Sequence, residues 1–178
     1  DDIGFIYSRC NILKNNSKNS DFIPEMNQDI LSGDVFNDLA KENFVPFVSA
    51  VIPKEKYEDV GGFPDWYQIS MDYYLFLQLA YKYQVAGIED VLCEYREHEN
   101  NSYKKQYVVG AKESISALMD FLPDIRVTNN LKFHYVNLSI MYLKERRFCE
   151  SIFVLIKHGG WSLFFIRFLR KVKKYLNV

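Results

Sequence analysis

The sequence predicts an α/β domain followed by an all-α helical segment, and three observations lead to this prediction. Short β-branched and aromatic runs alternate with helical spacing in the first hundred residues. From Lys104 onward, the apolar residues recur at helical spacing throughout. Residues 1–100 contain 8 Lys or Arg against 18 Asp or Glu, whereas residues 101–178 contain 14 against 5. We therefore expect two domains, 1–103 and 104–178, with different neighbours.

Strands are expected in three short segments of the first domain. The apolar runs predict strands at Ile3–Ser8, Val85–Ile88 and Val91–Arg96. Asn11–Ser20 is rich in Asn, Ser and Lys, which predicts a loop or a loose hairpin tip. Phe44–Ile52 contains a proline and is expected to be extended.

Helices in the first domain are predicted from their caps and spacing. Asp34 can cap a helix over Val35–Asn43, and the short helix Lys54–Val60 should end at Gly61-Gly62. Ser70 is a plausible N-cap for a helix over Met71–Tyr83, where apolar residues recur at helical spacing.

The second domain is expected to contain helices only. Pro123 and Gly159-Gly160 are the punctuating residues between its periodic segments. The predicted helices lie near 104–122, 127–145, 149–158 and 161–176.

Composition excludes several classes of protein. A hydrophobic fraction of 48% and an aromatic fraction of 16% exclude a disordered tail. No run of 18 or more uncharged apolar residues occurs, so no transmembrane helix is expected, and no secretory signal is visible. Cys10, Cys93 and Cys149 are odd in number, far apart and free of C-x-x-C spacing. This pattern predicts reduced, mostly buried thiols in a cytoplasmic protein.

Val60–Ser102 carries the most informative motifs, at spacings that suit one reaction centre. It contains the turn Gly61-Gly62-Phe63, the acid Asp72 at a predicted helix start, and the run YREHENNS. With LSGDVFNDLAKENFVPFVSAVIPKEKYEDVGGF at 31–63, these motifs resemble the second half of the catalytic domain of family-2 glycosyltransferases. The resemblance covers roughly residues 3–103.

This resemblance implies a partial GT-A fold that lacks the N-terminal, nucleotide-binding half. The parent enzyme would transfer a sugar from a nucleotide-sugar donor to a glycan or lipid-linked acceptor with inversion, in cell-surface polysaccharide synthesis. Asp1-Asp2 precedes a strand, whereas the metal-binding Asp-x-Asp of the family follows one. We therefore expect that motif upstream, and we expect this fragment alone to be inactive.

Asp72 corresponds to the catalytic base of the family. A base must lie near the acceptor hydroxyl and take its proton during the attack on the anomeric carbon. A helix N-terminus would favour the ionised carboxylate. Met71 stands where the family usually has a second acid. From the residues alone, Asp72 could instead be an ordinary acid that complements a helix dipole.

The run after the last predicted strand supplies three further candidates. The resemblance implies that His98 approaches a divalent metal or the diphosphate, and that Arg96 and Asn101 order the loop. Mn²⁺ or Mg²⁺ is thus expected in the complete enzyme, and no cofactor in this fragment. The alternative is an ordinary polar loop after a strand.

An acceptor-side surface is expected around Gly62, Phe63, Trp66 and Tyr67. The glycines require unusual backbone angles, with Phe63 packed beneath the turn. Trp66 and Tyr67 could stack on the apolar face of an acceptor sugar, or they could be partly buried loop anchors.

The last predicted helix, 161–176, carries Arg167, Arg170, Lys171 and Lys174 on one stripe. This pattern fits an anionic membrane surface, and the alternative is a packed helix with a solvated basic edge. No nucleic-acid motif accompanies the stripe, so no nucleic-acid partner is expected. A location in the cytoplasm, peripheral to the inner membrane face, follows from this interpretation. The strand edge at Ile3–Ser8 is expected to lack a partner and could join copies of the chain.

Two other classes of function compete with an enzyme. Met71 and the missing half favour a non-catalytic carbohydrate- or partner-binding module derived from such an enzyme. A structural helical adaptor, with the α/β part as support, is the third possibility.

Overall fold

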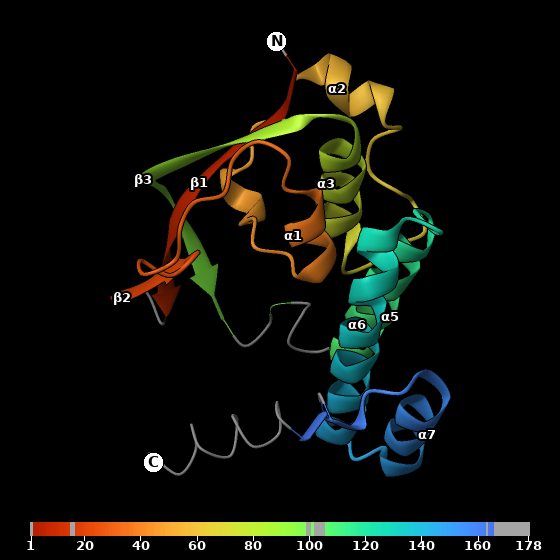
Figure 1. Ribbon diagram of the computed structural model, residues 1–178. Helices are drawn as coiled ribbons and strands as arrows, with labels where there is room; N and C mark the ends of the chain where they lie inside the picture. The colour runs from red at the N-terminus through yellow and green to blue at the C-terminus, as the bar shows by residue number, and fades with distance from the viewer. Residues whose placement is uncertain (1, 15–16, 99–100, 102–105, 163, 166–178) are drawn as a thin grey trace. The chain divides into compact units, whose positions relative to one another are not determined.

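The computed structural model describes residues 2–14, 17–98, 101, 106–162 and 164–165 (Figure 1). The chain is a mixed α/β protein that forms two compact units, Asp1–Gln106 and Tyr107–Val178. The sequence predicted the division near residue 103.

Unit 1 contains a three-stranded mixed sheet. The strands are β1 (Ile3–Lys14), β2 (Ser17–Ile23) and β3 (Gln84–Glu97), in the order β2-β1-β3. Strand β1 pairs antiparallel with β2 and parallel with β3 (Figure 1).

Two strand predictions were wrong in extent. For Asn11–Ser20 a loop or a loose hairpin tip was predicted. The segment does form a hairpin, but its strands reach further than expected, since β1 continues to Lys14 and β2 begins at Ser17. Strand β3 is continuous where two strands were predicted. In both places, pairing along the full length of the central strand outweighs the weak strand propensity of the polar residues.

The outer edges of the parallel pair, one on β1 and one on β3, are partly covered by loops. On β1, Ile6 and Val51 exchange two backbone hydrogen bonds of 2.9 Å, so the flank of Ile3–Ser8 is not fully open. On β3, Val85 pairs in the same way with Gly33, through bonds of 2.8 and 2.9 Å.

The core of unit 1 lies between the sheet and the helices α1 (Phe36–Lys41) and α3 (Met71–Lys82). The ring centroids of Phe5 and Phe76 lie 4.9 Å apart, which joins β1 to α3. Tyr73 donates its hydroxyl to the carbonyl of Leu39 at 2.7 Å, which joins α3 to α1. The prediction of a helix from Met71 to Tyr83 is confirmed to within one residue.

The segment between α1 and α3 contains two short helices. The first is the 3-10 helix η1 (Phe47–Ser49), within a stretch that was predicted to be extended throughout. The second is α2 (Lys54–Asp59), which ends before Gly61 and Gly62 as predicted. Both glycines have positive φ, 82° and 70°.

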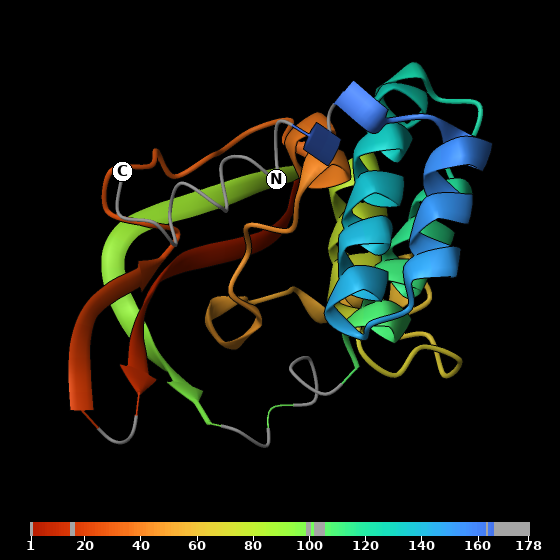
Figure 2. The same ribbon diagram turned by 90° about the horizontal axis from the view of Figure 1, so that it is seen from below.

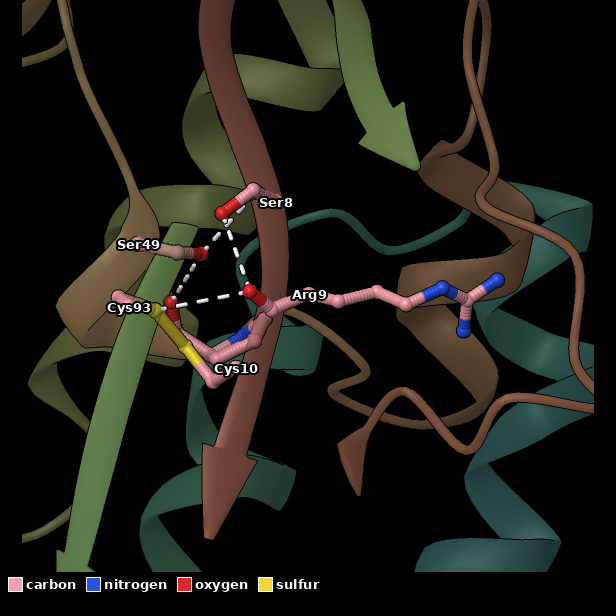
Figure 3. The surroundings of a disulfide bond; sticks show 6 residues. Ser8, Arg9, Cys10, Ser49 and Cys93 are labelled. Carbon is pink, nitrogen blue, oxygen red and sulfur yellow. Dashed lines mark hydrogen bonds between the residues drawn. A yellow bond between two sulfur atoms is a disulfide. The ribbon is translucent and has the colours of Figure 1, made fainter. Parts of the chain in front are cut away.

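The cysteine prediction was wrong. Cys10 on β1 and Cys93 on β3 form a disulfide, and only Cys149 is free (Figure 3). The two residues are 83 positions apart in sequence but are direct partners in the parallel register, with Cα atoms 4.8 Å apart. Their proximity follows from the strand order, which the spacing of cysteines does not reveal.

Arg9 lies on the opposite face of β1, because neighbouring residues of a strand alternate (Figure 3). Its side chain is 3% exposed. The guanidinium donates to the carbonyls of Pro24, Glu25 and Gln28, and to the Glu89 carboxylate. Arg9 therefore ties the segment after β2 to the sheet.

Unit 2 consists of α5 (Tyr107–Met119), α6 (Ile125–Lys144) and α7 (Phe148–His158). The carboxylate of Asp124 caps α6 by accepting from the amide of Arg126 at 2.8 Å. Apolar side chains from all three helices form the core, namely Val108, Ile115, Leu138, Tyr142 and Val154.

The predicted helix 161–176, with its four basic residues, lies mostly outside the described residues. Among the residues that the structure does describe, no helix is long and apolar enough to cross a membrane.

Candidate functional site

The glycine turn before α3 is built around Tyr57. The amide of Phe63 donates to the Tyr57 hydroxyl at 3.1 Å, and the two rings meet edge to face at 5.5 Å. A Cβ on Gly62 would lie 2.7 Å from the Tyr57 ring. Position 62 thus needs glycine for two reasons, the positive φ and this close approach.

This packing covers Phe63 only partly. The exposed fraction of its side chain is 36%, and the centre of its ring lies 5.9 Å from that of Phe47, which is also exposed. The turn therefore presents an aromatic surface to solvent.

A second aromatic group lies at the start of α3. Trp66 is 69% exposed and contacts Tyr67 and Tyr74 edge to face, at 6.2 and 6.3 Å. Tyr67 is buried and meets Tyr74 at 5.4 Å. For these two residues the sequence left open whether they anchor the loop or face an acceptor. Tyr67 is a buried anchor, whereas Trp66 is exposed to solvent and supported by the two tyrosines.

Asp72 lies in the first turn of α3, two residues before Tyr74. Its Oδ1 accepts from the amide of Tyr73 at 2.8 Å. Burial raises the pKa of Asp72, although backbone hydrogen bonds from Tyr73 and from its own amide act in the other direction. Desolvation of the carboxylate therefore outweighs these two backbone hydrogen bonds. A carboxylate with a raised pKa is the stronger base once it is ionised.

Met71 gives the neighbourhood of Asp72 an apolar surface. Its side chain is 36% exposed, where an acid would have placed a second charge. The raised pKa of Asp72 therefore has burial as its main cause.

The loop after β3 is held together by Asn101. Its Oδ1 accepts from the amide of His98 at 3.0 Å, and its amide donates to the His98 carbonyl at 3.2 Å. Its Nδ2 donates to the Tyr95 hydroxyl at 2.9 Å and lies 3.5 Å from the carbonyl of Arg96. Asn101 thus orders the backbone that carries Arg96 and His98.

The structure does not bring all the predicted residues together. Trp66 and Tyr67 contact Tyr74 in the first turn of α3, whereas Gly62 and Phe63 lie against Tyr57. In contrast, the end of β3 lies apart from the start of α3 in both views (Figures 1 and 2). Within the described part of the chain, no hydrogen bond or ion pair joins Asp72 to the Asn101 loop.

A divalent cation was expected in the complete enzyme, and no cofactor in this fragment. Among the described residues, no group of three or more His, Cys, Asp or Glu side chains could hold a metal ion. His98 is exposed.

Three aromatic residues of the site were not anticipated. Tyr57, Phe47 and Tyr74 support the turn and Trp66, as the ring contacts show. The signal available in the sequence was the density of aromatic residues between positions 44 and 83, which gives no pairing.

Comparisons with protein-family models, with curated proteins and with solved structures find no match to this chain.

Proposed function

We propose that this chain is the acceptor-side part of an inverting glycosyltransferase, as its resemblance to family 2 implies. The observation that carries the proposal is Asp72, a carboxyl group of raised pKa in the first turn of α3. In the loop before α3 lies Trp66, which is 69% exposed and contacts the buried ring of Tyr67. Activation of a sugar hydroxyl requires a base, and an exposed aromatic ring offers a surface for the apolar face of the sugar.

The reaction is a single displacement at the anomeric carbon. The acceptor sugar stacks on Trp66, which holds one hydroxyl toward Asp72. The hydroxyl oxygen forms the new glycosidic bond, and its proton passes to the Asp72 carboxylate. The bond from the anomeric carbon to the nucleotide breaks at the same time, and the nucleotide leaves with the bonding electrons from the opposite face.

Donor binding is assigned to the complete enzyme and not to this chain. As the resemblance implies, a divalent cation would be held by the complete domain, where it would neutralise the leaving diphosphate. Asn101 and Arg96 order the loop after β3, and this loop has a structural role. Contact with the diphosphate would be made in the intact domain.

The test uses the full-length natural protein and measures sugar transfer from a panel of nucleotide sugars. Asp72→Asn keeps the shape and removes the base, so kcat should fall by about 10²-fold or more, with little change in donor affinity. Asp65→Asn is the matched control, because Asp65 is an exposed acid of the same loop. Near-normal turnover of Asp72→Asn would make Asp72 a helix-dipole residue and would refute the mechanism.

A second candidate function rests on Trp66 alone. Its ring is 69% exposed, and such a platform binds sugars without any catalysis. In a non-catalytic binding module, Trp66→Ala would abolish glycan binding, Asp72→Asn would leave it intact, and the natural protein would neither transfer sugar nor hydrolyse donors. These outcomes separate the module from the enzyme.

The cytoplasmic location that the sequence predicted is also part of the proposal, with one observation against it. A disulfide such as Cys10–Cys93 persists mainly in oxidising compartments. Quenching cells in acid and then labelling the denatured protein with a maleimide tests the location, since protein from the cytoplasm should react at Cys10 and Cys93.

A further inference from the structure

Helix α7 is apolar on both sides, but only one side is packed. Its buried residues are Ser151, Val154 and Leu155. Val154 and Leu155 pack into clusters built largely from α6. Ser151 shares a buried hydrogen bond of 2.7 Å with Ser139 of α6. These contacts fix which side of α7 faces its own unit.

The other side of α7 presents four large apolar side chains to solvent. Phe148, Ile152, Phe153 and Ile156 are 60%, 49%, 62% and 68% exposed. Their spacing places them on one continuous face, away from the packed side. Single exposed apolar residues are ordinary, but a continuous apolar helix face marks a binding surface.

Cations border this face at the end of α7. Lys157 lies with its Nζ 6.0 Å from the centre of the Phe153 ring. Lys132 of α6 reaches the turn that follows α7, where its side chain is the neighbour of Gly159. No ion pair with an acid involves either lysine among the residues described.

The sequence continues this combination of aromatic and basic residues. Trp161 follows the turn, is 42% exposed, and stacks on Phe165 at 6.4 Å. Five of the eight residues 167–174 are Arg or Lys, and residues 101–178 contain 14 basic against 5 acidic residues. An apolar face beside such an excess of positive charge is complementary to an anionic bilayer.

We propose that the outer face of α7, formed by Phe148, Ile152, Phe153 and Ile156, docks on an anionic lipid membrane. The apolar side chains enter the boundary between headgroups and acyl chains, and Lys157 remains at the level of the phosphates. A second copy is the poorer occupant, because pairing two such faces would bring together two strongly basic segments. The proposal does not depend on the proposed glycosyltransferase activity.

The test is sedimentation of the full chain with vesicles of phosphatidylcholine, alone or mixed with phosphatidylserine. The wild type should bind the mixed vesicles, and Ile152→Gln/Ile156→Gln should weaken that binding by at least about tenfold. Ile125→Gln is the matched control, because Ile125 lies on α6 and is 67% exposed. This control should bind as the wild type does.

Fluorescence gives a second readout at the same surface. The chain has two tryptophans, so Trp66→Phe leaves Trp161 as the single reporter. Its emission should shift to the blue with mixed vesicles and stay unchanged with phosphatidylcholine alone. Changing Arg167, Arg170, Lys171 and Lys174 to Gln should weaken the binding without lowering the melting temperature.

Three results would overturn the proposal. The first is failure of the wild type to bind mixed vesicles. The second is equal binding by the wild type and by Ile152→Gln/Ile156→Gln. The third is a concentration-dependent dimer that the same double variant abolishes, which would assign the face to a second copy of the chain.

Discussion

Reduction of the Cys10–Cys93 disulfide should destabilise unit 1 strongly. The bond links β1 to β3 across 83 residues of sequence, which include α1, α2 and α3. Opening a loop of that length returns chain entropy to the unfolded state, worth about 4.5 kcal/mol at 25 °C. A urea m-value of about 1.5 kcal/mol/M converts this into a fall of about 3 M in the unfolding midpoint.

The assay is urea unfolding of the Trp161→Phe variant with and without a phosphine reductant. The remaining tryptophan, Trp66, lies in unit 1 and reports its unfolding separately from unit 2. Cys149→Ser serves as the control background, because Cys149 is the exposed free thiol and its removal should not alter the response to the reductant.

A count of thiols tests for the Cys10–Cys93 disulfide independently of stability. Unfolded protein should expose one reactive thiol before reduction, from Cys149, and three reactive thiols after reduction. Three thiols before reduction, in protein kept under air, would refute the pairing. A change in unfolding free energy below about 1 kcal/mol would refute the entropic argument even if the bond is present.

Three further predictions concern Arg9, the glycine turn and Asp72. Arg9→Leu should lower the free energy of unfolding by about 2–4 kcal/mol, because three carbonyls lose a charged donor. Glu89→Gln should lower it by less than about 1 kcal/mol. Equal losses for the two variants in a denaturant titration would contradict this prediction. Gly62→Ala should lower the melting temperature clearly more than Gly61→Ala, since of these two positions only 62 would bring a Cβ against an aromatic ring. Similar melting temperatures for the two variants would show that the Tyr57 ring moves aside. Because burial raises the pKa of Asp72, the folded state holds the proton more tightly, so stability should fall as the pH rises from the ordinary carboxyl pKa through the raised value. Asp72→Asn should remove that fall in calorimetry at several pH values, and an unchanged pH profile would contradict the burial of the charge.

The sequence predicted best where a local signal decides the structure. The glycines after α2 and the helix from Met71 were read correctly, because positive φ and helical spacing are properties of neighbouring residues. Asp124, which caps α6, was missed although it precedes an apolar helical run. A single capping residue is thus a weak signal for where a helix begins.

The sequence predicted poorly where strand order decides. Asn11 and Lys14 were assigned to a loop or a loose hairpin tip because they are polar, yet both are part of the central strand of the sheet. The same strand order brings Cys10 to Cys93 and gives the guanidinium of Arg9 its carbonyl partners. None of these pairings is visible in spacing, since each joins segments far apart in the chain.

The candidate site also contains residues that are close in sequence and residues that are far apart in sequence, and this difference bears on function. Asp72, Trp66 and the Gly62 turn are near in sequence, and local contacts order each of them, with Trp66 packed against Tyr74 of α3. His98 was attached to that centre only by its place in a motif, and the end of β3 lies apart from the start of α3 (Figures 1 and 2). A base with a platform can activate and orient an acceptor hydroxyl, but it cannot neutralise a departing diphosphate. Loss of transfer on changing Asp72, with His98→Ala leaving acceptor binding unaltered, is therefore the pattern expected of an acceptor-side part of a larger enzyme.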